Sequence, residues 1–447
     1  NHQNIISFEA SWEHKKQSSG YFLNTEYKPF TNILPLDSAS KYLLDQDVLI
    51  NTDKIESAVN YYYLLNPRNH INLTAGITNS NQDYQSAIRQ NLDDGSIKDL
   101  PSDAFANDSR FTFTDSYLSA HYKAKLGKLT ISPGVNWHYY NTNDTQGDIS
   151  NKSNKTLWLP DLYAKYDFGS TENLTFNYGL KAEFTDIKNL GRAITLRNYT
   201  SLFAGNRQLQ NIVYHQLNLS YMNFDMFNFT DFYLMANYQK RQDDITESVS
   251  YQGTDRLSFP TNTVDANDML FVNGSFGKKF TFMKIKLDAG INYTNMQNLV
   301  EQESNRNYSF KQNYKLSLES NFTIWPNFEI GIENSWSEYT SVSISQQFTT
   351  TSPFANIEAV FGGFVFVADY TYNKYQSANS EVSSEYDFLN ASLYYRQPGS
   401  AWEFKLAGNN ILNTESIRRD SFDDNVISTY QYFVQPRYFI LTVMYDL

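Results

Sequence analysis

The side chains that could do acid–base chemistry are scattered along the chain and form no recognisable catalytic motif. His121, His138 and His215 fall in segments where apolar and polar residues alternate, and His70 falls at a predicted turn. The sequence contains no nucleophile elbow, no phosphate-binding loop and no HExxH motif. A hydrogen bond within the protein is the simplest role for His138, which has the polar parity of its segment. The sequence therefore predicts a protein that is not an enzyme.

Adjacent aspartates occur at 93–94, 243–244 and 423–424, and paired loop carboxylates can bind calcium. Ile245 follows Asp244, so no regular ligand spacing continues there, and solvated external loops are the simpler interpretation. The absence of cysteine excludes disulfides and thiolate metal sites. We therefore expect neither a metal nor a cofactor.

A second set of charged residues occupies one parity of alternating segments. A Lys or Arg that faces lipid costs about 2–4 kcal/mol at the bilayer midplane, so charges confined to one parity indicate a wall between lipid and water. These charges would pair across neighbouring strands, with a place on the substrate path as the alternative. The residues predicted to face the lumen are Lys181, Glu183, Lys286, Asp288, Glu329, Glu333, Glu403 and Lys405.

The elements that must position these residues are long strands. Apolar or aromatic residues alternate with small or polar ones over 129–139, 174–185, 285–294 and 402–407. Because successive side chains of a strand point to opposite faces, each segment has one apolar and one hydrophilic face. The strands are about 10–16 residues long, against about 5–6 in soluble proteins, which favours a membrane barrel over a soluble sandwich.

Composition agrees with strands that separate lipid from water. Aromatic residues make up 16% of the 447 residues, yet the mean hydropathy is negative. No run approaches the 18 apolar residues of a helical membrane span. The net charge of −12 argues against nucleic-acid binding, and it mildly disfavours anionic substrates.

Short and long connections alternate, as in outer-membrane barrels with tight periplasmic turns and long external loops. The count gives about nineteen strands, the last at 430–447, so we expect the first strand to start on the external side. A closed bacterial barrel has an even number, so strands would be missing at the N-terminus. The predicted short turns are 66–69, 126–127, 169–170, 325–327, 361–363 and 396–399, and the predicted long loops are 34–51, 85–107, 143–153, 188–207, 244–265 and 416–427.

The six tryptophans are predicted to form two belts at the membrane interfaces. Trp325 and Trp402 lie beside short turns and Trp12 is placed near the first one, whereas Trp137, Trp158 and Trp336 fall toward the long loops. The closing strand, on which barrel assembly would depend, has one apolar parity made of Phe439, Leu441, Val443, Tyr445 and Leu447.

Three short motifs resemble those of TonB-dependent-receptor-like outer-membrane barrels. The segment LFAGNRQL at 202–209 resembles the GNP-x-L signature of that family, with Arg207 in place of proline. The segment LAGNNILN at 406–413 resembles its penultimate turn, and 436–447 resembles its closing strand but ends in Leu. The resemblance covers the whole chain as barrel. It implies a 22-stranded barrel with an N-terminal plug, of which residues 1–447 would be the barrel without the first strands.

The resemblance implies import of a nutrient across the bacterial outer membrane, with outer-membrane lipid, the plug and the TonB system as partners. The alternative is a structural or docking barrel in a larger envelope assembly, with a surface lipoprotein or other subunits as partners. A passive porin and a soluble all-β adhesin are further alternatives. The substrate remains open, since sugars, peptides, metal chelates and vitamins all fit.

Overall fold

The computed structural model describes residues 4–342, 344–378, 383–423 and 426–446, and nearly all of them belong to antiparallel strands. No helix in these residues has the length and apolar character needed to cross a bilayer. The all-β fold predicted from alternation is confirmed. The long strands, in order of pairing, are β1 (Asn4–Thr25), β2 (Tyr42–Asn66), β3 (Asn69–Asn91), β5 (Ala106–Leu126), β6 (Leu129–Gln146), β7 (Ile149–Asp167), β8 (Glu172–Glu183), β11 (Ile212–Asp225), β12 (Thr230–Arg241), β15 (Asn267–Phe280), β16 (Met283–Val300), β17 (Glu303–Ser320), β18 (Asn327–Thr340), β19 (Ser345–Phe361), β20 (Phe364–Ser377), β21 (Ser383–Arg396), β22 (Trp402–Asn409) and β25 (Tyr438–Tyr445).

The remaining elements lie in the long connections between these strands. Two hairpins, β13–β14 and β23–β24, are the largest of them, and β13–β14 also pairs with β10 and with the end of β16. These elements are β4 (Ile97–Asp99), α1 (Ser102–Phe105), α2 (Ile187–Leu190), β9 (Thr195–Asn198), β10 (Ser201–Phe203), β13 (Asp244–Gln252), β14 (Asp255–Thr263), β23 (Ser416–Asp423) and β24 (Val426–Phe433).

The strand count corrects the expected orientation of the first strand. The described residues contain eighteen long strands, and Asn4 pairs with Tyr63, close to the short turn after Asn66. β1 therefore starts at the short-turn end, not on the side of the long loops. The predicted last strand is also shorter, because Tyr430 belongs to β24 and Pro436, which has no amide hydrogen, lies in the break before β25.

The predicted short turns are confirmed, and two further ones join β11 to β12 and β15 to β16. Neither contains Gly or Pro; Phe229 and Thr281 adopt positive φ values of 50° and 31° there. The boundaries of several long loops shift, since β2 already begins at Tyr42 and β6 and β7 continue through most of 143–153. The turn at 281–282 carries no turn-forming residue type, whereas the turn at 226–229 is closed by Asp225, whose carboxylate accepts hydrogen bonds from the Phe227 and Asn228 amides.

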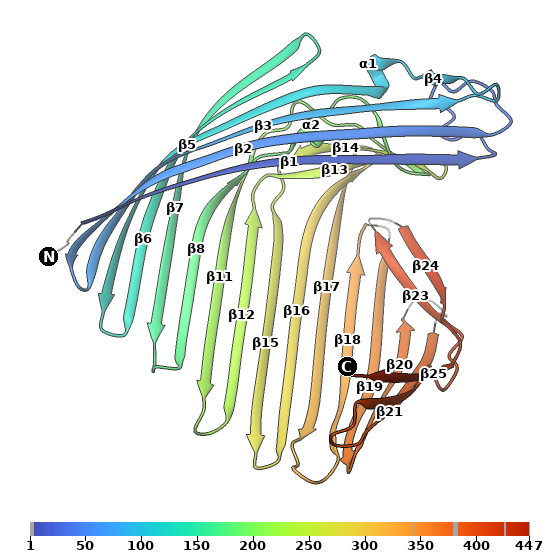
Figure 1. The fold of residues 1–447 in the computed structure, drawn as a ribbon. Helices are drawn as coiled ribbons and strands as arrows, with labels where there is room; N and C mark the ends of the chain where they lie inside the picture. Colours follow the sequence, from blue (N-terminus) through green and yellow to red (C-terminus); the bar gives the residue numbers. More distant parts are fainter. Residues whose placement is uncertain (1–3, 343, 379–382, 424–425, 447) are drawn as a thin grey trace.

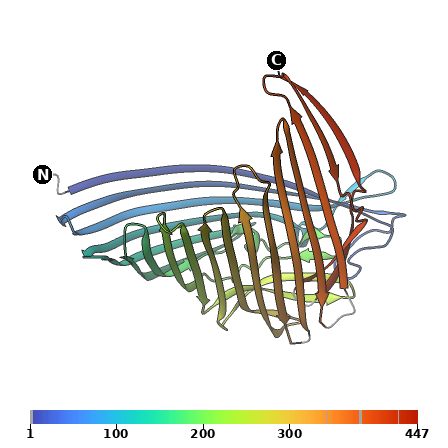
Figure 2. The same ribbon diagram turned by 90° about the horizontal axis from the view of Figure 1, so that it is seen from below.

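The sheet curls along its whole length, with the N-terminal and C-terminal strands at opposite ends (Figures 1 and 2). The connection between β8 and β11 packs on one face of the sheet, which we call the inner face. Its apolar residues join a small core with the upper ends of β2 and β3, where Leu44 and Ile88 are almost fully buried. The opposite face, the outer face, carries the apolar parity of each strand.

Large apolar side chains remain exposed along the outer face of strand after strand. Phe8 on β1, Leu118 on β5, Leu287 on β16 and Leu406 on β22 are 69%, 55%, 42% and 50% exposed. A soluble monomer rarely exposes so continuous an apolar surface, whereas a strand in a bilayer must present one to lipid. The register thus separates an apolar outer face from a polar inner face in the part of the sheet nearest the short turns.

Trp325 and Trp402 lie at the short-turn end, and Trp137, Trp158 and Trp336 lie eight or nine residues further along their strands. Trp12 is also eight residues beyond Asn4 and pairs with Ile55, so it belongs with the upper group and not beside a short turn as predicted. Eight or nine residues of a tilted strand span about 20–23 Å along the membrane normal, close to the ~25 Å apolar band of such barrels.

β1, β2, β3 and β5 are much longer than a bilayer requires, with 22, 25, 23 and 21 residues. Strands of that length extend about 70–80 Å, so they continue far beyond the upper tryptophan group. We call this extension the tall wall; in Figure 1 it sweeps across the top of the picture, over the upper ends of β12–β17. The outer face of this wall is polar there, with ion pairs such as Arg110–Asp83 at 2.7 Å and His14–Asp53 at 2.8 Å.

The β13–β14 hairpin is attached to the sheet through the turn between β16 and β17. The Glu301 carboxylate accepts hydrogen bonds from the Tyr251 amide at 2.5 Å and the Ser250 hydroxyl at 2.9 Å. These bonds, that from the Tyr251 amide foremost, lower the pKa of Glu301.

A change of pH tests this attachment. Because the folded pKa of Glu301 is lowered, its contribution is complete above the ordinary glutamate pKa of about 4.3 and disappears as the pH falls through the lowered value. Amide hydrogen exchange of 244–263 in wild type and Glu301→Gln checks it. We expect greater protection in wild type at pH 6 and a smaller difference at pH 3; the same difference at both pH values would contradict the assignment.

The two faces can be tested by placing a charge on each at the same height. Leu287→Arg puts a guanidinium on the outer face near the middle of the apolar band. We expect it to lower the free energy of unfolding in lipid bilayers by about 2–4 kcal/mol. Ser275→Arg is the matched control, because Ser275 pairs with Asp288 on the inner face. Equal losses for the two variants, measured by denaturant unfolding, would contradict the assignment of the faces.

Candidate ligand site on the inner face of the sheet

The eight charged residues predicted to face the lumen all lie on the inner face by register. Glu329 pairs in register with Glu319 and Asn356, and Glu403 pairs with Arg396 and Met444. Several make ion pairs, as expected for charges on adjacent strands. The contacts are Lys286 with Glu319, Glu183 with Arg241 at 3.0 Å, Glu329 with Lys315 at 3.9 Å, Glu403 with Arg396 at 3.7 Å, and Lys405 over the Tyr394 ring at 4.7 Å.

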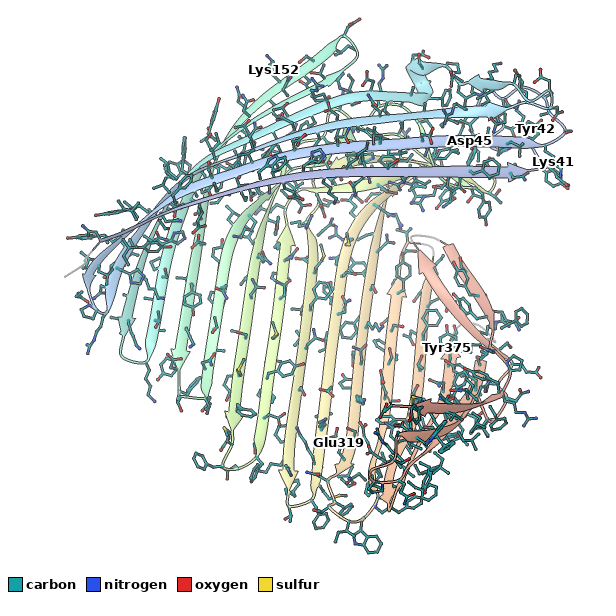
Figure 3. All side chains as sticks on the ribbon, viewed as in Figure 1. Lys41, Tyr42, Asp45, Lys152, Glu319 and Tyr375 are labelled. Atoms are coloured by element: carbon teal, nitrogen blue, oxygen red, sulfur yellow. The ribbon has the colours of Figure 1, made fainter. Side chains whose placement is uncertain are left out.

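These eight residues do not form one site. Lys181 and Glu183 lie on β8, and the other six lie on β16, β18 and β22, several strands away along the sheet. Figure 3 shows Glu319, the partner of Lys286, at the lower end of β17, far from the upper end of the wall. Their role in a transport path therefore stays a prediction.

A cavity of about 840 Å³ opens on the inner face across β2, β3, β5, β6, β7 and β8. A cavity of this volume is within the usual range for a small-molecule site. Its lining includes Lys181 and Glu183 from the predicted set, together with aromatic residues that alternation alone did not single out.

The aromatic part of this cavity comes from two strands, β5 and β6, and one loop residue. The Tyr140 ring lies 4.5 Å from Phe184 and 5.3 Å from His138, and His138 lies 5.4 Å from Tyr117. Phe113 contacts Phe184 at 5.0 Å. Phe184 had the apolar, outward parity in the sequence, but β8 ends at Glu183 and the chain then turns inward. Parity fails there because it holds only while the strand continues.

Two histidine–aspartate pairs flank the aromatic cluster. His138 Nδ1 lies 2.9 Å from an Asp115 carboxylate oxygen, and His121 Nε2 lies 3.0 Å from Asp161. Asn136 also donates to Asp161, at 2.7 Å. Each histidine thus has the hydrogen-bond partner that the sequence predicted for His138. In the described residues, no group of three or more His, Asp or Glu side chains is arranged to hold a metal ion.

The segment 185–211, which contains the Gly-Asn motif, covers the upper end of the cavity. A Cβ on Gly205 would lie 2.5 Å from the Gly191 carbonyl oxygen, so only glycine fits this close approach. The Gly205 amide donates to that oxygen at 2.7 Å, and the Asn206 amide donates to Asn189 O at 2.6 Å. The motif therefore folds the segment back on itself over the inner face.

Arg207, the residue that replaces the family's proline, anchors this segment to the sheet. Its Nε lies 2.5 Å from an Asp144 carboxylate oxygen on β6, and its Nη2 donates to the carbonyl oxygens of Asp144 and Ile149. The Asp144 side chain is only 7% exposed. The departure from the motif is thus a structural contact between the covering segment and the β6–β7 hairpin.

A second, smaller cavity of about 450 Å³ lies directly above the first, beneath Arg207 and the end of the covering segment. The two cavities share Phe111, Tyr140, Phe184 and Thr185, so they adjoin on the same wall. Lys155 on β7 lines the upper cavity and pairs in register with Tyr140. Sequence spacing could not predict the lining of this upper cavity, because segment 185–211 is far from β6 and β7 in sequence and contacts them only in the folded structure.

The aspartate pairs considered for calcium have other partners. Asp93 accepts two hydrogen bonds from Ser40, and Asp94 accepts two from Ser96. Asp244 is 3% exposed and contacts Arg241 at 3.0 Å, so it is a buried structural residue and not part of a solvated loop. The third pair, at 423–424, lies outside the described residues.

Comparison with known families identifies the family of the chain. The outer membrane protein beta-barrel family matches residues 1–445, so the chain belongs to this family and is a protein of the bacterial outer membrane. None of the curated proteins is significantly similar to it in sequence.

Solved structures resemble the chain only distantly. The copper transporter OprC is 8% identical with a TM-score of 0.42, over 99% of this chain and 80% of OprC. The siderophore receptor PirA from Pseudomonas aeruginosa is 9% identical with a TM-score of 0.34, over 100% and 81%. The outer membrane transporter YddB from Escherichia coli is 8% identical with a TM-score of 0.29, over 97% and 75%.

Removal of Arg207 tests the anchor of the covering segment. Arg207→Met leaves the mostly buried Asp144 carboxylate without its cation, so we expect a loss of about 1.5–3 kcal/mol in local stability. Limited proteolysis of the protein in lipid measures this loss, because cleavage within 185–211 reports how often the segment opens. The double variant Arg207→Met/Asp144→Asn should recover part of it; no difference between wild type and the single variant would contradict the anchor.

Proposed function

We propose that this chain is the barrel of a TonB-dependent receptor that binds a small nutrient and imports it across the outer membrane. The observation that carries the proposal is the inner-face cavity of about 840 Å³ with its aromatic cluster. A simple diffusion pore gains nothing from a built pocket, whereas a receptor must hold its ligand before transport. We assign binding and not catalysis to this site.

The open edges of the sheet support a larger barrel. In the described residues, β1 pairs only with β2 and β25 only with β22, so their other edges have no strand partner. Unpaired backbone groups in hydrocarbon cost several kcal/mol each, so further strands must close the ring. Since β1 and β25 both have their free ends at the short-turn side, an even number of added strands fits. We propose that these strands, and a plug for the lumen, precede residue 1.

Uptake in living cells tests the import function. The growth medium is analysed for compounds that wild-type cells remove and that a strain lacking the gene for this protein leaves behind. Energised import predicts that a TonB-deficient strain leaves the same compounds behind. Large steady conductance of the purified full-length protein in planar bilayers, or depletion that does not need TonB, would instead show a passive pore.

The tall wall favours one second function, a docking barrel for a surface partner. The upper parts of β1, β2, β3 and β5 present a polar outer face well above the membrane, which transport alone does not require. Purification from native membranes decides between the two. A surface lipoprotein or other subunit recovered in equal amounts, with unchanged uptake after deletion, would establish the docking function.

A further inference from the structure

The two adjoining cavities contain lysines without ion-pair partners, and these lysines point to the chemistry of the ligand. This inference rests on the proposed function, because it concerns the ligand of the same wall. Every carboxylate that lines the cavities has a partner in the described structure. The contacts are Glu56 with Lys54, Asp115 with His138, Asp144 with Arg207, Asp161 with His121, Glu183 with Arg241, and Asp186 with the Asn189 amide.

Three lysines of the same lining make no ion pair with a described residue; one of them, Lys152, is exposed near the turn between β6 and β7, and the other two lie on the inner face. Lys155 on β7 and Lys181 on β8 make no ion pair with any described residue, although their strands are neighbours. Lys155 is partly buried on the inner face, whereas Lys181 is exposed there. A partly enclosed cation without a counter-charge is less well solvated than a free lysine and attracts an anion more strongly than an exposed one.

The upper cavity also contains an unused hydrogen-bond donor. The side-chain amide nitrogen of Asn211 is buried and has no acceptor in the described structure. Buried polar atoms are almost always hydrogen-bonded, so an orphaned donor beside a cavity marks a place where an acceptor can bind. Two cations and an amide donor all call for a ligand rich in acceptor oxygens.

The shared aromatic residues define the rest of the ligand. Tyr140 and Phe184 belong to both cavities, with His138 stacked on Tyr140 at 5.3 Å. Rings offset in this way leave faces and edges on which a planar group can pack. We propose that the wall binds a small organic anion, with its charged oxygens at Lys155 and Lys181 and its ring against Tyr140 and Phe184.

This inference departs from the whole-chain charge. The net charge of −12 mildly disfavours anionic substrates, but Glu56, Asp144 and Glu183 of this lining pair with a lysine or an arginine, and the other three carboxylates accept hydrogen bonds within the wall. The local field at the two lysines, and not the total charge, decides which ligand is attracted.

Titration of the full-length protein in outer-membrane vesicles with phenyl phosphate tests the proposal. We expect saturable binding, weakened about tenfold or more by Lys155→Gln and by Lys181→Gln, because each removes a charged hydrogen-bond donor. Lys155→Arg and Lys181→Arg should retain it. Lys41→Gln is the control, since Lys41 lies at the far end of the wall (Figure 3). Resistance of the folded barrel to unfolding in detergent checks that each variant folds.

Neutral benzyl alcohol and cationic phenyltrimethylammonium should bind far more weakly than phenyl phosphate. Equal binding of the three probes, no binding of phenyl phosphate, or unchanged affinity in the two glutamine variants would overturn the proposal. Import and ligand class can fail separately. Lysine-dependent binding in a protein without energised uptake would reject import alone, whereas TonB-dependent uptake with unchanged binding in the lysine variants would reject the ligand class alone.

Discussion

A backbone in hydrocarbon has no water to satisfy its amide and carbonyl groups, and this constraint governs the whole chain. An antiparallel meander satisfies it by pairing each strand with its neighbours, as β1 through β25 do with almost unbroken register. Once pairing is fixed, the period of two leaves one side of each strand for lipid and one for water. Composition follows from this: aromatic and aliphatic residues on one parity, Asn, Ser, Thr and charges on the other.

The connection from β8 to β11 creates the candidate ligand site on the inner face of the sheet. Because β8 ends at Glu183, the chain crosses the inner face and returns at Ile212, and it leaves two adjoining cavities beneath it. Arg207 holds the crossing segment to Asp144, and Gly205 lets it fold closely on itself. The site thus depends on the place where the barrel pattern stops. A regular strand could not bring Phe184, Lys155 and Arg207 to one lining.

The barrel class, the faces and most short turns followed from the sequence, because alternation is a local property that each strand repeats. The number of strands did not follow: about nineteen were expected and the described residues form eighteen long ones, while 244–265, predicted as a long loop, contains the β13–β14 hairpin. The predicted position of Trp12 beside a short turn was wrong for a related reason, since the sequence does not show how far the neighbouring strand extends. The eight predicted inner charges have one parity, yet only Lys181 and Glu183 line the cavity. Which of these charges line a common cavity depends on the course of the long connection from β8 to β11, and the alternation of residues does not predict that course.

The alternation of lipid and water along each strand is the claim on which everything else rests, and the lack of native cysteine makes it directly measurable. Single cysteines introduced from 284 to 294 on β16 can carry a nitroxide label in bilayers. Collision with oxygen, which dissolves in lipid, should peak at odd positions such as 285 and 287. Collision with a water-soluble nickel chelate should peak at even ones such as 286 and 288. Labels at 285, 287 and 291 that are shielded from both reagents, or two profiles that rise and fall together, would show a soluble packed sheet and contradict the account.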